Sequence, residues 1–148
     1  MLEELYQEII LDHYRRPRNR GRIDPSDLQA HDSNPLCGDE ITVTAKLSDG
    51  KIADIKFDGH GCSISTASAS IMTETLKGRT LPQADSLFET FHTLVTGPKD
   101  PGHAGMHQGK LAVFAGVSEF PTRVKCAILC WHTLRAALEG NEEAVTTE

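Results

Sequence analysis

The segment ITVTAKLSDGKIADIKFDGHGC, residues 41–62, carries the pattern that decides the fold. Apolar and polar residues alternate over residues 41–47, which is typical of a β-strand with one buried face. Asp49-Gly50 is the strongest short signal for a hairpin turn, and the alternation resumes over residues 53–57. The segment therefore predicts two antiparallel strands joined by a tight turn.

The register of this hairpin follows from matching apolar residues across the two strands. A two-residue loop would place Val43 opposite Lys56. A three-residue loop, residues 49–51, places Val43 opposite Phe57 instead. Because a one-residue slip exchanges the two faces of a strand, apolar matching favours the three-residue loop.

This register also predicts which residues meet at the open end of the hairpin. It places Cys37 opposite Ser63, and Asp39 opposite Gly61. Cross-strand neighbours lie about 5 Å apart. We therefore expect Cys37, Asp39 and Cys62 to come together, although 25 positions separate the two cysteines.

The rest of the chain reads mainly as helices. Helical spacing of apolar residues, with proline or glycine as stop signals, predicts four helices near residues 2–16, 63–78, 86–96 and 124–139. Residues 28–33 form a weak strand pattern, residues 97–110 read as a loop, and residues 111–117 are ambiguous. We expect one α+β domain over residues 1–148, with a small three-stranded antiparallel sheet covered on one side by helices.

Composition excludes several classes of protein. The 148 residues suit one domain, and the net charge of −6 disfavours nucleic-acid binding. No apolar run approaches the roughly 20 residues of a membrane span, and the N-terminus is acidic where a signal peptide is basic. We therefore expect a cytoplasmic protein without membrane contact. Arginines gather in residues 15–22, where a solvated loop is favoured over a docking patch for an acidic partner.

The four cysteines indicate metal binding or catalysis, because the cytosol keeps thiols reduced. Cys62 precedes a predicted helix, and Cys126 is expected in the first turn of another. Backbone N–H groups at a helix start favour anions, and Arg123 and Lys125 flank Cys126, so both thiols should ionise readily. A lone cysteine is usually a buried apolar residue, but these lie in glycine-rich turns and at helix starts.

Three ordered motifs resemble the IscU/NifU-N family of iron–sulfur cluster assembly proteins. They are NPLCGD at residues 34–39, GHGCSISTASAS at residues 59–70 and RVKC at residues 123–126. The segments DHY, PRNRG and FPTR, which begin at residues 12, 17 and 120, look like the SufU branch of that family. Two features also point to this branch. Lys125 stands where IscU-type proteins have histidine, and the 63 residues between Cys62 and Cys126 accommodate the branch's insertion.

The resemblance adds Cys126 to the site and implies a function. It implies a SufE/IscU-like fold and a Zn²⁺ site formed by Cys37, Asp39, Cys62 and Cys126. It further implies that Cys37 accepts persulfide sulfur from a PLP-dependent cysteine desulfurase of the SufS type, that Arg123 helps to dock or steer the transfer, and that iron–sulfur scaffold proteins follow downstream. Asp39 would be the weakest ligand, which makes the site exchangeable.

Two other functions remain open for the same residues. The first is a scaffold that carries a transient 2Fe–2S or 4Fe–4S cluster, and the second is a structural zinc domain. Lys125 and the long insertion favour sulfur transfer, and Asp39 disfavours a purely structural site.

For four further residues, a purely structural role competes with a functional role. Cys130 is favoured as a small core residue over a resolving thiol or an alternative ligand. His103 and His107 are four apart, but the glycines around them disfavour a helical metal pair. His60 could relay protons or could be a plain turn residue.

Overall fold

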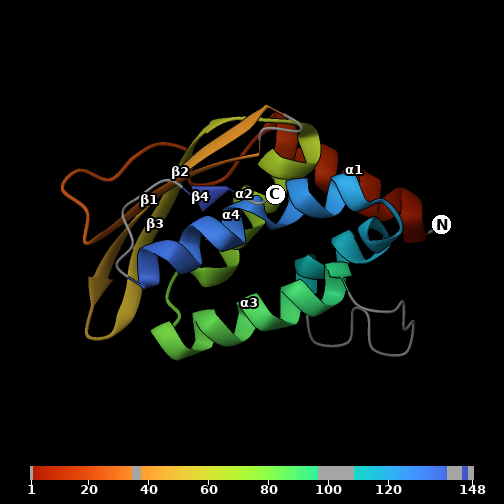
Figure 1. The fold of residues 1–148 in the computed structure, drawn as a ribbon. Coiled ribbons are helices and arrows are strands. Elements are labelled where there is room, and N and C mark those ends of the chain that lie inside the picture. The colour runs from red at the N-terminus through yellow and green to blue at the C-terminus, as the bar shows by residue number, and fades with distance from the viewer. Residues whose placement is uncertain (1, 35–37, 97–108, 140–144, 147–148) are drawn as a thin grey trace.

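The computed structural model describes residues 2–34, 38–96, 109–139 and 145–146 (Figure 1). The elements in chain order are α1 (Leu2–Arg15), β1 (Leu28–Asn34), β2 (Asp39–Ser48), β3 (Lys51–His60), α2 (Ser63–Leu76), α3 (Leu81–Thr96), the 3₁₀-helix η1 (Gly109–Glu119), α4 (Pro121–Leu138) and β4 (Val145–Thr146).

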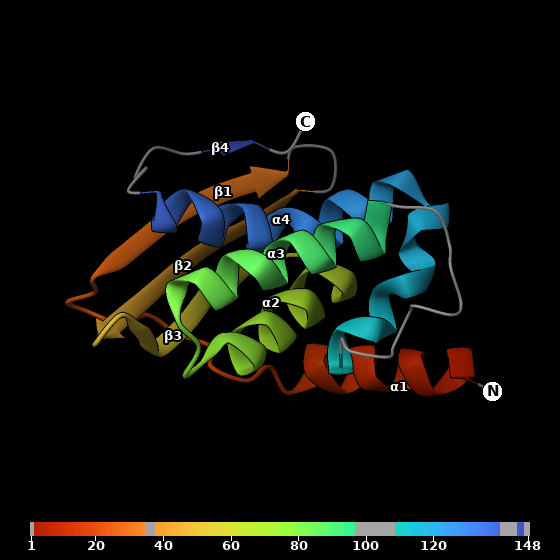
Figure 2. The same cartoon turned by 90° about the horizontal axis from the view of Figure 1, so that it is seen from below.

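The sheet confirms the predicted α+β architecture. Its strand order is β3-β2-β1-β4, and β1, β2 and β3 are antiparallel neighbours. β4 adds a parallel pairing at Asp32 and Ser33 of β1 that was not predicted, because two residues are too few to carry a strand pattern. The helices gather on one side of the three long strands (Figure 2).

Aromatic residues fill the core between the helices. Trp131 of α4 stacks on Phe91 of α3 with ring centroids 5.0 Å apart, and Phe114 of η1 meets Phe91 edge-on at 5.6 Å. All three side chains are fully buried. This cluster joins α3, α4 and η1 and so holds the helical layer together.

The β2–β3 hairpin has the predicted register but not the predicted loop. The turn is the two-residue Asp49-Gly50, whose φ angles of 53° and 74° are the left-handed values that this turn requires. A β-bulge leaves Ala53 unpaired, and this extra residue brings Val43 opposite Phe57. The three-residue loop was wrong because the additional residue lies in β3 and not in the turn.

α3 begins at Leu81, five residues before the predicted start. The side-chain carbonyl of Gln83 accepts the Thr80 N–H at 2.9 Å, and the Thr80 hydroxyl accepts the Gln83 N–H at 3.2 Å. This reciprocal pair is a capping box, which satisfies backbone N–H groups that a helix start leaves without partners. The predicted loop at residues 97–110 lies almost wholly outside the described residues.

The arginine-rich loop after α1 makes contacts within the protein. Arg16 and Arg18 donate to the Asp12 carboxylate at 2.6 and 2.7 Å, and these bonds lower the pKa of Asp12 to about 2, that from Arg18 most. Arg20 donates to the Gly59 carbonyl at 2.7 Å. These contacts attach the loop to α1 and β3. The sequence favoured a solvated loop over a docking patch, and neither interpretation included these contacts within the protein.

His13 is a buried polar anchor between α1, α2 and η1. Its ring is 1% exposed, and its Nδ1 lies 2.7 Å from the Ser70 hydroxyl, which also accepts the Arg18 N–H at 2.9 Å. Lys110 Nζ lies 3.3 Å from His13 Nε2. Burial, with the charges of Arg18 and Lys110, lowers the pKa of His13, which favours the neutral ring.

None of the helices within the described part of the chain is both long and apolar enough to span a bilayer.

We expect Ser70→Ala to lower the free energy of unfolding by about 1–3 kcal/mol, because it leaves the His13 ring and the Arg18 amide without their partner. Urea unfolding followed by circular dichroism measures the change. Ser86→Ala, at an exposed position of α3, is the matched control. Equal stability of the two variants would contradict an anchoring role for this hydrogen bond.

Candidate metal centre

Three of the four predicted ligands meet in the structure. One ligand atom from each of Asp39, Cys62 and Cys126 lies within 4.8 Å of the other two. Asp39 begins β2, Cys62 is the N-cap of α2, and Cys126 lies on α4. Cys37, the fourth predicted ligand, lies outside the described residues, so its place at this site stays a prediction.

The hairpin positions Asp39 beside Cys62, as its register predicts. The strand ladder ends with Glu40 opposite His60, so Asp39 and Gly61 follow at its open end. Asp39 is 1% exposed, and its Oδ1 accepts the Cys62 N–H at 2.9 Å. The second oxygen, Oδ2, lies 4.0 Å from Cys62 Sγ. One carboxylate oxygen thus fixes the backbone, and the other faces the thiol.

Two glycines allow the chain to pass this close. A Cβ atom at Gly59 would collide with the Glu40 carbonyl, and the φ of Gly59 is +129°. A Cβ at Gly61 would lie 2.8 Å from Asp39 Oδ1 and 3.0 Å from Ser65 Oγ. Any side chain at Gly61 would therefore displace the carboxylate from the Cys62 amide.

Cys62 has an acidic thiol. The pKa of Cys62 is lowered to about 6, first by its hydrogen bond with Cys126 and then by the N–H groups of Ser65 and Ile64, which outweigh burial and the Asp39 charge. The Ser65 N–H donates to Sγ at 3.4 Å. The N–H groups at the helix start thus contribute to the low pKa of Cys62, although Cys126 contributes more, and this cysteine also reaches the surface.

Cys126 occupies a different position from the one predicted. α4 begins at Pro121, because proline lacks an N–H and fits the first helical position. Cys126 therefore lies beyond the first turn, and the prediction that it sits there was wrong. It is 4% exposed and takes part in the thiol pair with Cys62.

Arg123 lies one turn before Cys126 and is exposed. Its guanidinium group stacks over the Phe120 ring, 4.6 Å from the ring centroid. Phe120 is 47% exposed. An aromatic ring and a cation thus lie together on the surface, within two turns of Cys126 along the chain.

Cys130 lies in the core, one turn after Cys126. It is 1% exposed, its Sγ lies 3.4 Å from the Ser68 hydroxyl, and burial raises the pKa of its thiol to about 12. Within the described ranges, the cluster of possible metal ligands does not include it. These observations favour a small core residue over a ligand or a resolving thiol.

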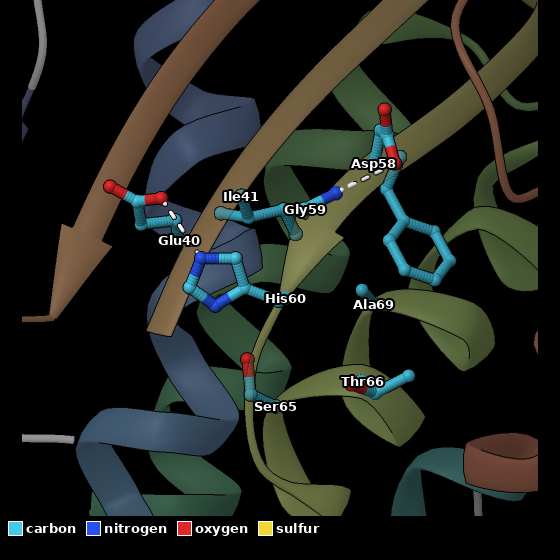
Figure 3. A pocket seen from close by; sticks show the side chains of 9 residues that line it. Glu40, Ile41, Asp58, Gly59, His60, Ser65, Thr66 and Ala69 are labelled. Atoms are coloured by element: carbon cyan, nitrogen blue, oxygen red, sulfur yellow. Dashed lines mark hydrogen bonds and ion pairs between the residues drawn. The ribbon is translucent and has the colours of Figure 1, made fainter. Parts of the chain in front are cut away.

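The structure describes His60 but not the pair His103 and His107. His60 is exposed and pairs with Glu40 at 3.1 Å, and Figure 3 shows its ring directed at that carboxylate. His103 and His107 lie outside the described residues.

A small hollow lies beside the site, between the end of the hairpin and the start of α2 (Figure 3). It is lined in part by Gly59, His60, Ser65 and Thr66, and its volume is about 10 Å³. That is room for about one water molecule and not for an organic substrate.

The donor set fits a single zinc ion. Two Zn–S bonds of about 2.3 Å in tetrahedral geometry place the sulfur atoms about 3.8 Å apart, inside the observed limit of 4.8 Å. Thiolates with one carboxylate also suit iron in a cluster, so the residues alone leave both metals open.

Comparison with known proteins places the chain in a family. Residues 5–127 match the family model described as the NifU-like N terminal domain. The chain is 40% identical to the zinc-dependent sulfurtransferase SufU of Bacillus subtilis, over 95% of this chain and 94% of that protein. It is 38% identical to the iron–sulfur cluster assembly scaffold protein IscU of Streptococcus pyogenes serotype M1, over 97% of this chain and 88% of that protein.

A solved structure agrees with these relatives. It is described as an iron–sulfur cluster assembly scaffold protein for the SUF system from Fervidobacterium islandicum AW-1, and it is 34% identical to this chain. The two superpose with a TM-score of 0.80 over 88% of this chain and 94% of that one. The chain is therefore a SufU-type member of the IscU/NifU-N family of iron–sulfur cluster assembly proteins.

Proposed function

We propose that the chain binds Zn²⁺ through Cys37, Asp39, Cys62 and Cys126 and accepts sulfur from the persulfide of a cysteine desulfurase. The observation that carries this proposal is the meeting of Asp39, Cys62 and Cys126 at the open end of the hairpin. The cytoplasm, where thiols stay reduced, is the compartment that suits this chemistry.

Zinc is favoured by the mixed character of the ligand set. Thiolates bind Zn²⁺ tightly, whereas a carboxylate is a harder and weaker ligand, so the Asp39 position can exchange. The similar protein from Bacillus subtilis, named a zinc-dependent sulfurtransferase, supports the same choice. When bound, the ion would keep the thiols ionised and hold them in one orientation.

The chemical step is a thiol–persulfide exchange. The Cys37 thiolate attacks the terminal sulfur of the desulfurase persulfide, and a new sulfur–sulfur bond forms at Cys37. The sulfur–sulfur bond on the desulfurase breaks, and its cysteine leaves as a thiolate. The proton balance closes because one thiolate is consumed and one is released.

The proposed donor is a protein. Arg123 and Phe120 are exposed one or two turns before Cys126, where they can contact a macromolecular surface. A PLP-dependent desulfurase of the SufS type, with its persulfide on a protein cysteine, fits these constraints, and an iron–sulfur scaffold protein would receive the sulfur afterwards.

A second candidate function is an iron–sulfur scaffold. The chain is 38% identical to a protein named as such a scaffold, and the same four residues could hold a 2Fe–2S or 4Fe–4S cluster. Lys125 and the 63 residues between Cys62 and Cys126 favour transfer, because they separate the SufU branch from IscU-type scaffolds.

We expect Cys37→Ala to abolish sulfur acceptance, because no other thiol in the proposal receives the persulfide sulfur. Desulfurase turnover of cysteine, measured as alanine released with and without the chain, detects the loss. Cys130→Ala is the matched control, since that thiol is buried in the core. Full stimulation by Cys37→Ala would refute Cys37 as the acceptor.

We expect Asp39→Cys to tighten zinc binding at least about tenfold and to slow sulfur transfer, because four thiolates make a closed structural site. Competition with a chromophoric chelator measures the affinity, and single-turnover assays with persulfidated desulfurase measure the transfer. Asp58→Cys, on β3 of the same hairpin, controls for the added thiol. Faster transfer by Asp39→Cys would show that exchange at this position does not limit the reaction.

A further inference from the structure

The loop after α1 runs along the outer edge of β3, which is an end strand of the sheet. The Phe57 N–H donates to the Asn19 carbonyl at 3.1 Å, and the Gly21 N–H donates to the Phe57 carbonyl at 2.8 Å. Arg20 thus forms a parallel bridge with Phe57 and satisfies backbone groups that a sheet edge leaves open. Asn19 and Gly21 have φ angles of 59° and 136°, which asparagine and glycine tolerate best.

The same loop is also bonded to α2. The Arg18 N–H donates to the Ser70 hydroxyl at 2.9 Å, and the Asn19 side-chain amide donates to the Thr73 hydroxyl at 3.2 Å. The loop therefore joins β3 to α2 through hydrogen bonds. Residues 61 and 62 join the same two elements through the chain itself.

Arg20 extends the contact of the loop with β3 toward this junction. Its Nη2 atom donates to the Gly59 carbonyl at 2.7 Å. Alternate residues of an antiparallel pair direct their backbone groups away from the partner strand, so Gly59 presents its carbonyl at the same edge as Phe57. The guanidinium group supplies the donor that a further strand would supply, and a charged donor makes a stronger hydrogen bond than a neutral one.

The packing between the end of β3 and the start of α2 is incomplete. The hollow of about 10 Å³ lies here, lined in part by Gly59 and His60 on one side and by Ser65 and Thr66 on the other (Figure 3). Close-packed side chains would hold two elements in place without further contacts. Where the packing is interrupted, the hydrogen bonds of the loop contribute more to the position of the turn.

This turn leads directly to the candidate metal centre. Cys62 follows Gly59 by three residues, and its N–H donates to Asp39 Oδ1 at 2.9 Å. A Cβ atom at Gly61 would lie 2.8 Å from the same oxygen, so the backbone passes the carboxylate with little room to shift. The position of residues 59–62 therefore matters for the contact between Cys62 and Asp39.

We propose that Arg20 is a positioning residue whose hydrogen bond to the Gly59 carbonyl holds the turn at residues 59–62 and so keeps the Cys62 N–H against Asp39. Arg20 acts through the backbone of the turn and not as a ligand. Its effect on metal binding rests on the proposed function, whereas its effect on the turn does not.

The first test is amide hydrogen exchange, followed by NMR on protein treated with a chelator so that the result does not depend on bound metal. Arg20 is exposed, so Arg20→Ala leaves the core intact. We expect this variant to speed exchange of the Cys62 N–H at least about threefold, because the turn loses a charge-assisted hydrogen bond. The Trp131 N–H in the core of α4 is the internal reference and should keep its wild-type rate.

Two further variants separate the hydrogen bond from other effects. Arg20→Lys should restore part of the protection, because an ammonium group can also donate to a carbonyl. Arg15→Ala, at an exposed arginine at the end of α1, is the matched control and should exchange like the wild type. Wild-type exchange of the Cys62 N–H in Arg20→Ala would overturn the proposal. Equal acceleration at Cys62 and Trp131 would also overturn it, because that result marks a loss of overall stability.

Zinc competition with a chelator then tests the link to the ligands. We expect Arg20→Ala to bind zinc at least about threefold more weakly than the wild type, with Arg20→Lys between the two. Equal affinities of wild type and Arg20→Ala would overturn the link to the ligands. Absence of zinc binding in every variant, with the difference in Cys62 exchange retained, would instead contradict the proposed function and support the positioning of the turn.

Discussion

The hydrogen bond from the Cys62 N–H to Asp39 Oδ1 is the constraint on which the rest of the site depends. It ties the first residue of β2 to the N-cap of α2 at the end of the hairpin. Gly61 is required between them, because any Cβ there would push the carboxylate away. The same tie directs the second oxygen of Asp39 toward Cys62 Sγ. The hydrogen bond of the Cys62 backbone N–H thus sets how the Asp39 carboxylate faces the Cys62 thiol.

The site concentrates negative charge in a partly buried place. Hydrogen bonds from Cys126 and from two backbone N–H groups lower the pKa of Cys62 to about 6, which favours the thiolate. Asp39 adds a buried carboxylate beside it. A divalent metal ion at the point where the ligand atoms converge would balance these negative charges. The charges at the site therefore favour a metal centre independently of the comparison with relatives.

Local pattern predicted the hairpin and the meeting of Asp39 with Cys62, because alternation and face matching determine register. The predicted length of the turn was wrong, because the turn is one residue shorter and a bulge at Ala53 restores the register. Such bulges have no clear sequence signal. The early start of α3 could have been found, because Thr80 and Gln83 have capping-box spacing. The place of Cys126 depends on how α4 packs, and the hydrogen bond from Arg20 to Gly59 depends on how the loop after α1 reaches β3. Local sequence patterns do not predict either of these tertiary contacts.

The most direct test of this account is zinc K-edge X-ray absorption on the protein purified without oxygen, together with its metal content. We predict one zinc per chain with three sulfur atoms at about 2.3 Å and one oxygen at about 2.0 Å, the set formed by Cys37, Cys62, Cys126 and Asp39. A brown protein that contains iron and sulfide would contradict the zinc-held sulfur acceptor in favour of the scaffold. Four sulfur ligands around zinc would contradict the role given to Asp39.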